Sequence, residues 1–479
     1  MSALPTGVPG GAQFRNKPLS GYYKREVPAE DAGITHAGPG TALGEHMRQF
    51  WQPVCLASQL TDRPLALRIL NEDLVAFRDK RGRVGLLHRH CCHRGASLEY
   101  GIIQECGIRC CYHGFHYDVD GTLLDVPAER DRGARLRQSV SQGAYPTIER
   151  DGLVFAYLGP PETTPPFPEY DAFEKSGDTR LVPFSNVFPC NWLQVIDNIA
   201  DQVHTSFLHN IPLLYGGHVP EGLNWQPLTL SNFAAVPVMD YVQVRDGTSM
   251  CFIAGRRVGE NRLWLRIQDI IVPNMTEHAY LFEDGAERRI FHRVHMSRWY
   301  VPVDDTHSII FGWRMFGTEI DPYQKGDESR LGWDNMDFLG GQVGDREYGE
   351  SQVLPGDWEA ITSQRPIAIH ALEHPIEGDV GVYMFRKLLR AAVRGENPAA
   401  DPAAYHARAR RGEPYHCYTQ NDILAVPKRA DEAEDREVIR KVGRKIVEIT
   451  AEGDRFQGEA RRTFIVRRIE DLERSAGTL

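Results

Sequence analysis

The sequence predicts an α+β fold in which a small all-β domain precedes a larger domain of helices and long strands. Three observations predict it. Short strand-like stretches separated by turn signals run from about residue 50 to 157, a proline-rich stretch follows at 159–171, and helical and long strand-like patterns alternate after it. Because proline cannot join a central sheet and stiffens a linker, the proline-rich stretch marks the boundary.

The small domain is predicted from VAFRD, RVGLL, GIRCCYHGFHYD and LVFAYLG, with turn signals such as DKRGR and DVDGT between them. Beyond the boundary, apolar residues at helical spacing predict a helix in NWLQVIDNIADQVHTSFLHN, and VGVYMFRKLLRAAVRG predicts another that ends at glycine. Long strands are expected within 228–316, a polar loop at 396–416, and charged helices at 429–449 and 458–475. The predicted regions are therefore an arm at 1–40, a β domain at 41–160, an α+β domain at 161–395, and at 396–479 a loop and helices that pack on it.

Composition restricts the class of protein. The 479 residues, 42% hydrophobic and 25% charged, are typical of a globular protein of two or three domains. A formal charge of -10 argues against nucleic acid as a partner, because phosphate binding needs a basic surface. The sequence has no signal-like N-terminus and no run of 18 apolar residues, so we expect a cytoplasmic protein without a membrane segment.

Four of the nine cysteines form two similar motifs. Cys91-x-His93 is followed, after 16 residues, by Cys110-x-x-His113, and each histidine has a glycine close behind it. Two thiolates and two imidazoles on two loops can hold a structural zinc or a [2Fe–2S] cluster of the Rieske type, which has two Cys on one iron and two His on the other. The flanking glycines favour the cluster, because they let the backbone approach the bridging sulfides.

Each motif cysteine has a cysteine neighbour, Cys92 or Cys111, that does not fit the spacing. We expect these two to be small buried hydrophobic residues, since a disulfide between them is disfavoured in a reducing cytosol. No chemical role is expected for Cys106.

A second motif lies in the first helical segment of the larger domain, as Asp201-x-x-His204-x-x-x-x-His209. Two histidines and a carboxylate form the facial triad of non-haem Fe(II) oxygenases. Residues five apart on a straight helix point about 140° apart. We therefore expect the helix to end or to carry a π-bulge near Ser206, so that both histidines can reach one ion.

Together the two motifs resemble the α subunits of Rieske non-haem iron oxygenases, in the branch similar to phthalate dioxygenase that includes aryl-ether O-demethylases. The resemblance covers roughly residues 38–395. GDWEAITSQRPIAIHALEHP resembles the family segment that carries the third iron ligand, which implies Asp357. Gly356 departs from the acidic residue usual before it, and Asp197 and Glu359 are rival ligands.

The resemblance implies a Rieske domain followed by a helix-grip catalytic domain with an antiparallel sheet. It implies a terminal oxygenase in the catabolism of aromatic compounds, with a [2Fe–2S] cluster, Fe(2+), O₂, and electrons from a separate NAD(P)H-dependent flavin and iron–sulfur reductase or ferredoxin. In the family, a residue at the position of Asp201 bridges an iron-ligand histidine and a cluster histidine of the next subunit. This chain is therefore expected to form a homotrimer or a trimer-based hexamer. Asp201, one helical turn before His204, should hydrogen-bond it from the same side of the helix.

The implied substrate is an aromatic compound, in particular a carboxylated one that is hydroxylated. A carboxylate needs a fixed donor, and Arg256, Arg257 and Arg266 on the expected strands are candidates. Strand alternation allows only one of the first two to face the pocket. Removal of an O- or N-methyl group by the same metals is an alternative. A non-catalytic electron-transfer protein or zinc scaffold is an alternative of another class.

Overall fold

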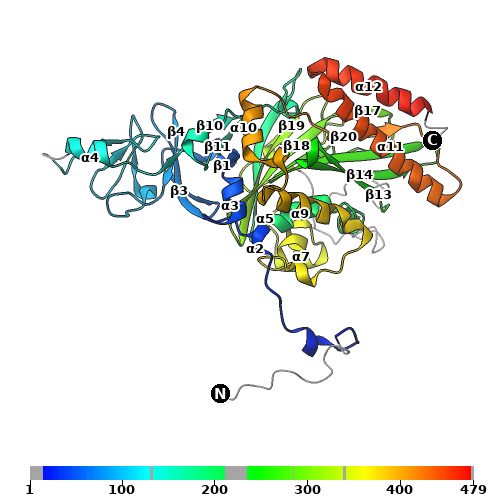
Figure 1. The fold of residues 1–479 in the computed structure, drawn as a ribbon, viewed down its shortest axis with the longest axis horizontal. Coiled ribbons are helices and arrows are strands. Elements are labelled where there is room, and N and C mark those ends of the chain that lie inside the picture. Colours follow the sequence, from blue (N-terminus) through cyan, green and yellow to red (C-terminus); the bar gives the residue numbers. More distant parts are fainter. Residues whose placement is uncertain (1–14, 130–132, 211–234, 284, 338–340, 476–479) are drawn as a thin grey trace.

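The computed structural model describes residues 15–129, 133–210, 235–283, 285–337 and 341–475. A small β-rich part lies at one end of the molecule, and a larger part of sheet and helices forms the rest (Figure 1). This mixed architecture confirms the predicted α+β class. The first fourteen residues of the predicted arm lie outside the described ranges, and Figure 1 shows the following segment leading away from the body.

The small part consists of three antiparallel sheets. One has three strands, β1 (Gln52–Leu56), β11 (Leu153–Ala156) and β10 (Thr147–Arg150). The two four-stranded sheets contain β2 (Leu65–Ile69), β3 (Glu72–Arg78), β4 (Val84–His88) and β9 (Ala144–Tyr145), and β5 (Ile102–Ile103), β6 (Ile108–Arg109), β7 (His116–Tyr117) and β8 (Leu123–Asp125). The predicted strands of this region are thus present.

The larger part contains a nine-stranded antiparallel sheet. Seven strands follow the order β12 (Arg180–Phe188), β19 (His307–Phe316), β18 (Val294–Asp304), β16 (Met275–Ala279), β15 (Arg262–Ile271), β14 (Ser249–Val258) and β13 (Val238–Val244). Off this path, β20 (Gln420–Leu424) pairs with β15 and with β17 (Arg289–His292). The long strands expected within 228–316 are confirmed for the described residues.

Helices cover both faces of this sheet, as the alternation of side chains along β14 shows. Met250 and Phe252 belong to the core with α5 (Trp192–Ala200) and α9 (Val380–Val393). Cys251 and Ile253 belong to a second core with α11 (Glu432–Glu452) and α12 (Gly458–Ser475). Successive strand residues point to opposite faces, so one strand supports two cores.

The remaining α-helices of the described ranges are short, and one of them corrects a prediction. They are α2 (Ala32–Thr35), α3 (Ala42–Met47), α4 (Gly133–Ser139), α7 (Tyr348–Val353), α8 (Asp357–Thr362) and α10 (Pro402–Arg410). The prediction of a loop throughout 396–416 was wrong, because α10 lies within it. Asp401 accepts a hydrogen bond from the Ala403 N–H, and Pro402 occupies the first helical position. These two residues form a capped start from which the helix can begin. The charged helices expected at 429–449 and 458–475 are present as α11 and α12.

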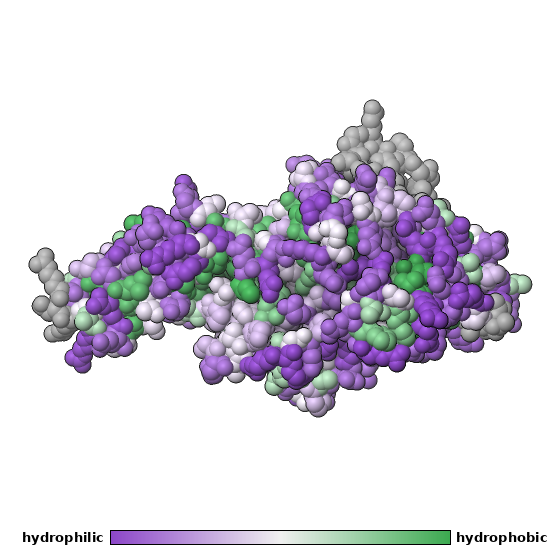
Figure 2. All heavy atoms as spheres, turned by 90° about the horizontal axis from the view of Figure 1, so that it is seen from above, coloured by the Kyte–Doolittle hydropathy of each residue, from purple (hydrophilic) through white to green (hydrophobic). Residues whose placement is uncertain are grey.

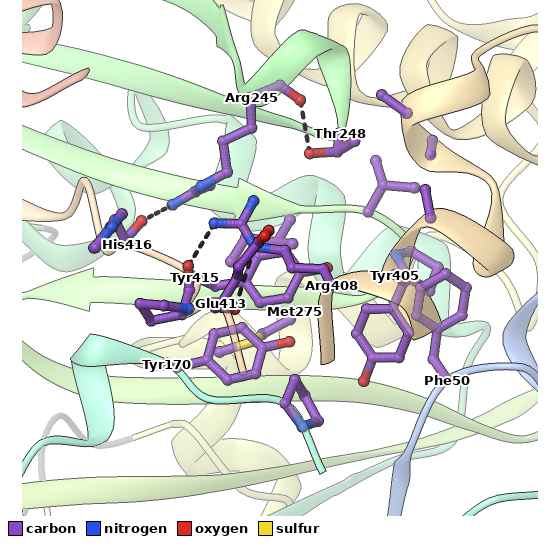
Figure 3. A pocket seen from close by; sticks show the side chains of 18 of the residues that line it. Phe50, Tyr170, Arg245, Thr248, Met275, Tyr405, Arg408, Glu413, Tyr415 and His416 are labelled. Carbon is purple, nitrogen blue, oxygen red and sulfur yellow. Dashed lines mark hydrogen bonds between the residues drawn. The ribbon is translucent and has the colours of Figure 1, made fainter. Parts of the chain in front are cut away.

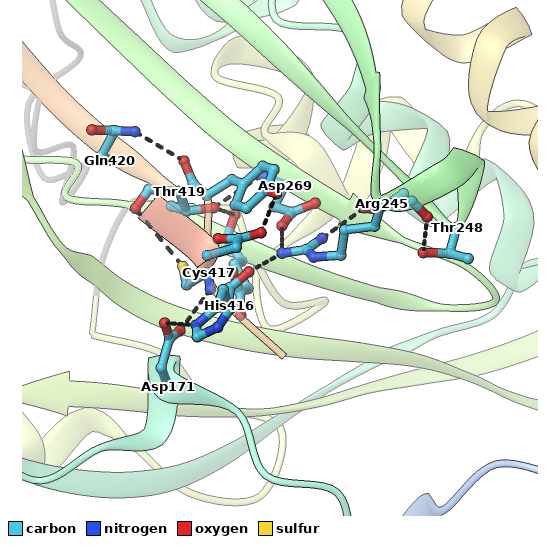
Figure 4. A network of polar contacts seen from close by, with 12 residues as sticks. Asp171, Arg245, Thr248, Asp269, His416, Cys417, Thr419 and Gln420 are labelled. Atoms are coloured by element: carbon cyan, nitrogen blue, oxygen red, sulfur yellow. Dashed lines mark hydrogen bonds and ion pairs between the residues drawn. The ribbon is translucent and has the colours of Figure 1, made fainter. Parts of the chain in front are cut away.

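A polar network ties the linker and the C-terminal segment to the sheet (Figure 4). Asp171, in the linker, accepts hydrogen bonds from the Cys417 N–H at 2.6 Å and from His416 Nδ1 at 3.0 Å. Arg245 forms an ion pair with Asp269 of β15 at 2.6 Å and also donates to the carbonyl of His416. These contacts hold residues 416–417 in place before β20 enters the sheet.

The surface seen in Figure 2 is polar over most of its area, with apolar residues in small separate patches. None of the helices in the described ranges is both long enough and apolar enough to cross a membrane.

The free energy of unfolding should depend on Asp422 of β20. Its side chain is fully buried, accepts from the Phe291 N–H at 2.8 Å, and has its pKa raised to about 7 by burial. In the unfolded chain this carboxyl loses its proton near pH 4. Between roughly pH 4 and 7 the folded protein keeps this proton and the unfolded chain does not. The free energy of unfolding should therefore fall by up to about 1.4 kcal/mol for each unit by which the pH rises in this range. Denaturant unfolding of Asp422→Asn at several pH values should lack this component, and identical pH slopes would contradict it.

Candidate metal centres

Two loops of the small part place Cys91 and Cys110 at equivalent positions. In each loop the cysteine N–H donates to the carbonyl five residues on, at 2.9 and 2.8 Å. Gly95 and Gly114 donate back to the cysteine carbonyls at 2.8 and 3.1 Å. Both glycines have a positive φ, of 75° and 76°, which side chains disfavour. The glycines after each histidine therefore close two matching loops.

The four predicted cluster ligands converge at the tips of these loops. The cysteine side chains are buried, with exposed fractions of 4% for Cys91 and 3% for Cys110. Burial raises the pKa of the Cys110 thiol, and its contact with the Cys91 thiol raises it further. The rings of His93 and His113 lie with their centroids 4.6 Å apart. Two adjacent sulfurs and two adjacent imidazoles fit the S₂N₂ ligand set of a Rieske cluster.

The neighbouring cysteines are exposed, so the expectation that Cys92 and Cys111 are buried was wrong. Both are free thiols, without a disulfide between them. The physical reason is that the loop turns outward immediately after each ligand cysteine. Cys92 Sγ lies 3.3 Å from the hydroxyl of Tyr117, which also lies 2.9 Å from Cys91 Sγ.

The helix that leads into the second motif is shorter than predicted. Asn191 caps α5 by accepting from the Leu193 N–H at 3.1 Å, and the helix ends at Ala200 rather than near Ser206. Asp201 has an extended backbone, with φ -93° and ψ 100°. Two 3₁₀ turns, His204–Ser206 and Leu208–Asn210, then carry the two histidines. The break in the helix thus lies before both histidines and lets them face one point.

The structure brings His204, His209 and Asp357 together, from segments far apart in the chain. The Nε2 atoms of both histidines lie 3.4 Å from Asp357 Oδ1, and the three ligand atoms are within 4.8 Å of one another. Burial lowers the pKa of His209 to about 4. Burial alone would raise the pKa of Asp357, but His209, His204 and Gln342 together lower it. Neutral imidazoles and an ionised carboxylate are the forms that bind a metal, so the set fits an Fe(II) triad.

Hydrogen bonds orient these side chains. His204 donates from Nδ1 to the backbone carbonyl of Asp201, which leaves its Nε2 facing Asp357. Asp357 accepts from Gln342 Nε2 at 2.6 Å and from Asn198 Nδ2 at 3.4 Å. Metal ligands are commonly held by such outer partners. Sequence reasoning missed Gln342 and Asn198; the only available signal was the Asp-Asn pair at 197–198.

The position of Asp201 corrects the expected geometry. Its carboxylate accepts from the Val203 N–H at 2.9 Å and lies 3.9 Å from His204 Nδ1, too far for a hydrogen bond. The backbone carbonyl, not the carboxylate, is therefore the partner of His204, because the helix has already ended. The carboxylate remains 31% exposed.

The rival ligands have other partners. Asp197 forms a buried ion pair with Arg386 at 2.7 Å. Glu359 accepts from the Gly356 N–H at 2.8 Å and pairs with Arg346 at 2.5 Å, so it caps α8. Neither belongs to the cluster of metal-ligating atoms.

A cavity of about 50 Å³ adjoins the triad. Arg266 of β15 lines it and donates to Gln202 Oε1 at 2.9 Å, and burial lowers its pKa to about 9. Arg256 donates to Thr205 Oγ1 at 3.1 Å behind the cavity wall. Arg257 points to the opposite face of the sheet and pairs with Asp435 of α11 at 3.0 Å, which removes it as a substrate contact.

A larger cavity lies elsewhere. It measures about 580 Å³ and is lined by aromatic and basic residues of the linker, the sheet end and the segment around α10 (Figure 3). The rings of Tyr170 and Tyr415 stack at 5.1 Å, and the Arg408 guanidinium lies 4.4 Å from the Tyr415 ring. The walls of this cavity do not include the triad, so the metal chemistry belongs to the smaller one.

Comparisons with known proteins agree with both centres. A model of the Rieske [2Fe–2S] domain matches residues 50–143, which contain the paired Cys-His motifs. The chain is 47% identical over 472 residues to the oxygenase subunit of tert-butanol monooxygenase/tert-amyl alcohol desaturase from Aquincola tertiaricarbonis, covering 98% of this chain and 99% of that protein. The chain belongs to the Rieske oxygenases. The family predicted from the two motifs is thereby confirmed.

Other relatives of this Rieske oxygenase are named for aromatic substrates. The phenoxybenzoate dioxygenase α subunit of Ectopseudomonas oleovorans is 35% identical, with 81% of this chain and 90% of that protein covered. The 5,5'-dehydrodivanillate O-demethylase oxygenase subunit of Sphingobium sp. is 30% identical, with 77% and 82% covered.

The Rieske oxygenase is thus the terminal component of a multicomponent enzyme. It uses O₂ to oxidise a substrate, and its cofactors are a [2Fe–2S] cluster and a mononuclear iron. The alternatives of a zinc scaffold and of a non-catalytic electron carrier are set aside.

Proposed function

We propose that the two side-chain sets described above are the ligands of the two centres. The set for the cluster is Cys91, His93, Cys110 and His113, and the set for the iron is His204, His209 and Asp357. Convergence of the last three from two 3₁₀ turns and α8 is the observation that carries the proposal. When bound, the iron supplies O₂ activation and the cluster supplies single electrons, chemistry that side chains lack.

Neighbouring residues of the chain orient the proposed iron ligands. Gln342 and Asn198 fix the Asp357 carboxylate, and the Asp201 carbonyl fixes the tautomer of His204. A substrate bound in the small cavity would lie beside the triad.

We infer that electrons reach the iron from the cluster of a neighbouring subunit in a homotrimer or trimer-based hexamer. Three observations support this. His93 lies on an exposed loop, Asp201 presents a partly exposed carboxylate next to His204, and the small part extends away from the sheet (Figure 1). Asp201 would receive a hydrogen bond from the neighbour's cluster histidine. The nine free cysteines support a reducing, cytoplasmic setting.

Asp201→Asn should keep both metals and the oligomer but block electron delivery. The amide has the same shape and can still accept from the Val203 N–H. It lacks the negative charge that, in this proposal, attracts a cluster histidine of the neighbouring subunit. In single-turnover mixing with substrate and O₂, the reduced cluster should therefore persist, and steady-state turnover should fall by about 10- to 100-fold. Wild-type turnover in this variant, or a fully active monomer, would contradict the cross-subunit route.

For the substrate we propose a compact, branched aliphatic alcohol that is hydroxylated on a carbon. The support is the end-to-end similarity to a subunit named for tert-butanol and tert-amyl alcohol.

An aromatic carboxylate, hydroxylated or demethylated, is the second candidate. Arg266 favours it, because this buried guanidinium lines the cavity and a substrate carboxylate would neutralise it. Relatives named for phenoxybenzoate and dehydrodivanillate support it as well.

Oxygen uptake distinguishes the two candidates. The purified oxygenase, supplied with a ferredoxin or flavin reductase and NADH, should consume O₂ with tert-amyl alcohol and form a hydroxylated product. Uptake with aromatic or methoxylated aromatic acids instead would establish the second candidate. Sustained turnover with NADH and no reductase would contradict the multicomponent proposal.

A further inference from the structure

One buried polar side chain at the iron cavity has no hydrogen-bond partner among the described residues. Gln268 of β15 is 0% exposed and lines the same cavity as His204, His209 and Asp357. Strand alternation places it on the face that Arg266 occupies, while Ile267 points into the core beneath α11. Gln268 and the histidines of the two 3₁₀ turns thus line one cavity.

Neither polar atom of this amide has a hydrogen-bond partner in the part of the chain that the structure describes. A buried amide without partners costs free energy comparable to several lost hydrogen bonds, so native proteins rarely leave one. Among the described residues, Asn186 is the other buried Asn or Gln that lacks partners at both atoms, and it does not line this cavity. The free-energy cost of the unpaired Gln268 amide is therefore incurred at the cavity beside the triad, which is the proposed substrate site.

The chemistry of the amide selects its partner. The amide offers a donor N–H₂ and an acceptor oxygen, and a hydroxyl group offers one donor and acceptor lone pairs, so the two can satisfy each other. A carboxylate only accepts. It would leave the amide oxygen buried and facing a negative charge.

The other polar groups of the wall already have partners. Arg266 donates to Gln202 Oε1 at 2.9 Å, and His278 Nε2 lies 2.8 Å from Thr276 Oγ1. Among these groups, Gln268 is the one left to meet a new molecule.

We propose that Gln268 is a specificity-determining residue that recognises the hydroxyl group of the substrate. The proposal rests on the proposed function and deepens it, by naming a neutral, hydroxyl-bearing substrate and the side chain that reads the hydroxyl. A site built to hydrogen-bond a hydroxyl rejects the analogue that lacks it, because the buried polar group then stays unpaired.

The test compares tert-amyl alcohol with 2,2-dimethylbutane, in which a methyl group replaces the hydroxyl. Wild-type oxygenase should prefer the alcohol in kcat/KM, measured by product formation. Gln268→Leu should lose about 10- to 100-fold on the alcohol, chiefly in KM, and little on the hydrocarbon, so the preference collapses. Gln268→Asn, which keeps the amide, should retain part of it. An unchanged preference in Gln268→Leu would overturn the proposal.

Asn186→Leu is the matched control, since it removes an equally buried, unpartnered amide of β12 away from the cavity. It should leave the preference unchanged, whereas a collapse there would show that the effect is merely structural. Cluster absorbance and iron content establish that each variant is folded and loaded.

A binding measurement separates failure of this inference from failure of the proposed function. Anaerobic calorimetric titration of the holoenzyme should show tert-amyl alcohol binding that weakens in Gln268→Leu, whether or not the alcohol is turned over. Binding without turnover would sink the alcohol hydroxylase proposal but retain hydroxyl recognition. Tighter binding of trimethylacetate than of tert-amyl alcohol would overturn the inference in favour of anion recognition through Arg266.

Discussion

Asp357→Ala should remove the mononuclear iron and reduce turnover by more than about 100-fold, while the visible spectrum of the cluster survives. Loss of an outer partner of a metal ligand already costs 10- to 100-fold, and loss of one of three ligands should cost more. The cluster should persist because its ligands lie in a separate part of the molecule. Iron analysis, absorbance and oxygen uptake on the same sample measure the three quantities.

Glu359→Ala is the control for this prediction. Glu359 lies two residues further along α8, carries the same charge and was a rival ligand, but it caps the helix instead. Its removal should leave the iron content unchanged and lower the stability by about 1 kcal/mol. If Glu359→Ala lost the iron and Asp357→Ala kept it, the assignment of the third ligand would be wrong.

Cys110→Ser should abolish the cluster spectrum, whereas Cys111→Ser should leave it intact. Cys110 is buried beside Cys91, while its neighbour Cys111 is exposed. Serine keeps the size of the side chain but is a poor ligand for an iron–sulfur cluster. Absorbance and electron paramagnetic resonance of the reduced proteins test the pair, and the opposite result would mean that the other cysteine of each pair is the ligand.

The sequence predicted which side chains meet, but not the local geometry that lets them meet. Motif spacing was sufficient to predict that His204 and His209 share an ion and that the helix is broken near them. Two residues five apart on an unbroken helix point in different directions and cannot bind one ion. The spacing could not place the break at Ala200, since Val203 and the flanking residues have no strong helix-breaking character. The turn of the Asp201 carboxylate toward the Val203 N–H follows from that break and was therefore missed as well.

Long-range partners were harder to predict than the ligands. Gln342 lies in the loop before α7 and donates to Asp357 at the start of α8, and no local pattern marks a glutamine as an outer partner. In the sequence Gln268 is an ordinary polar residue of a strand, and it is distinguished only by the lack of a hydrogen-bond partner among the described residues. The outward position of Cys92 and Cys111 likewise depends on how each loop turns.

The place of β20 in the sheet has a consequence for synthesis of the protein. This strand comes from residues 420–424 yet pairs with β15, and α11 and α12 then cover the rear face of β14. The three-stranded sheet of the small part, by contrast, is complete once residue 156 has emerged. On the ribosome the cluster-binding part can fold early, while the iron-binding sheet must wait for nearly the whole chain. Nascent chains arrested before residue 420 should therefore acquire the cluster-binding fold but not a protease-resistant iron site.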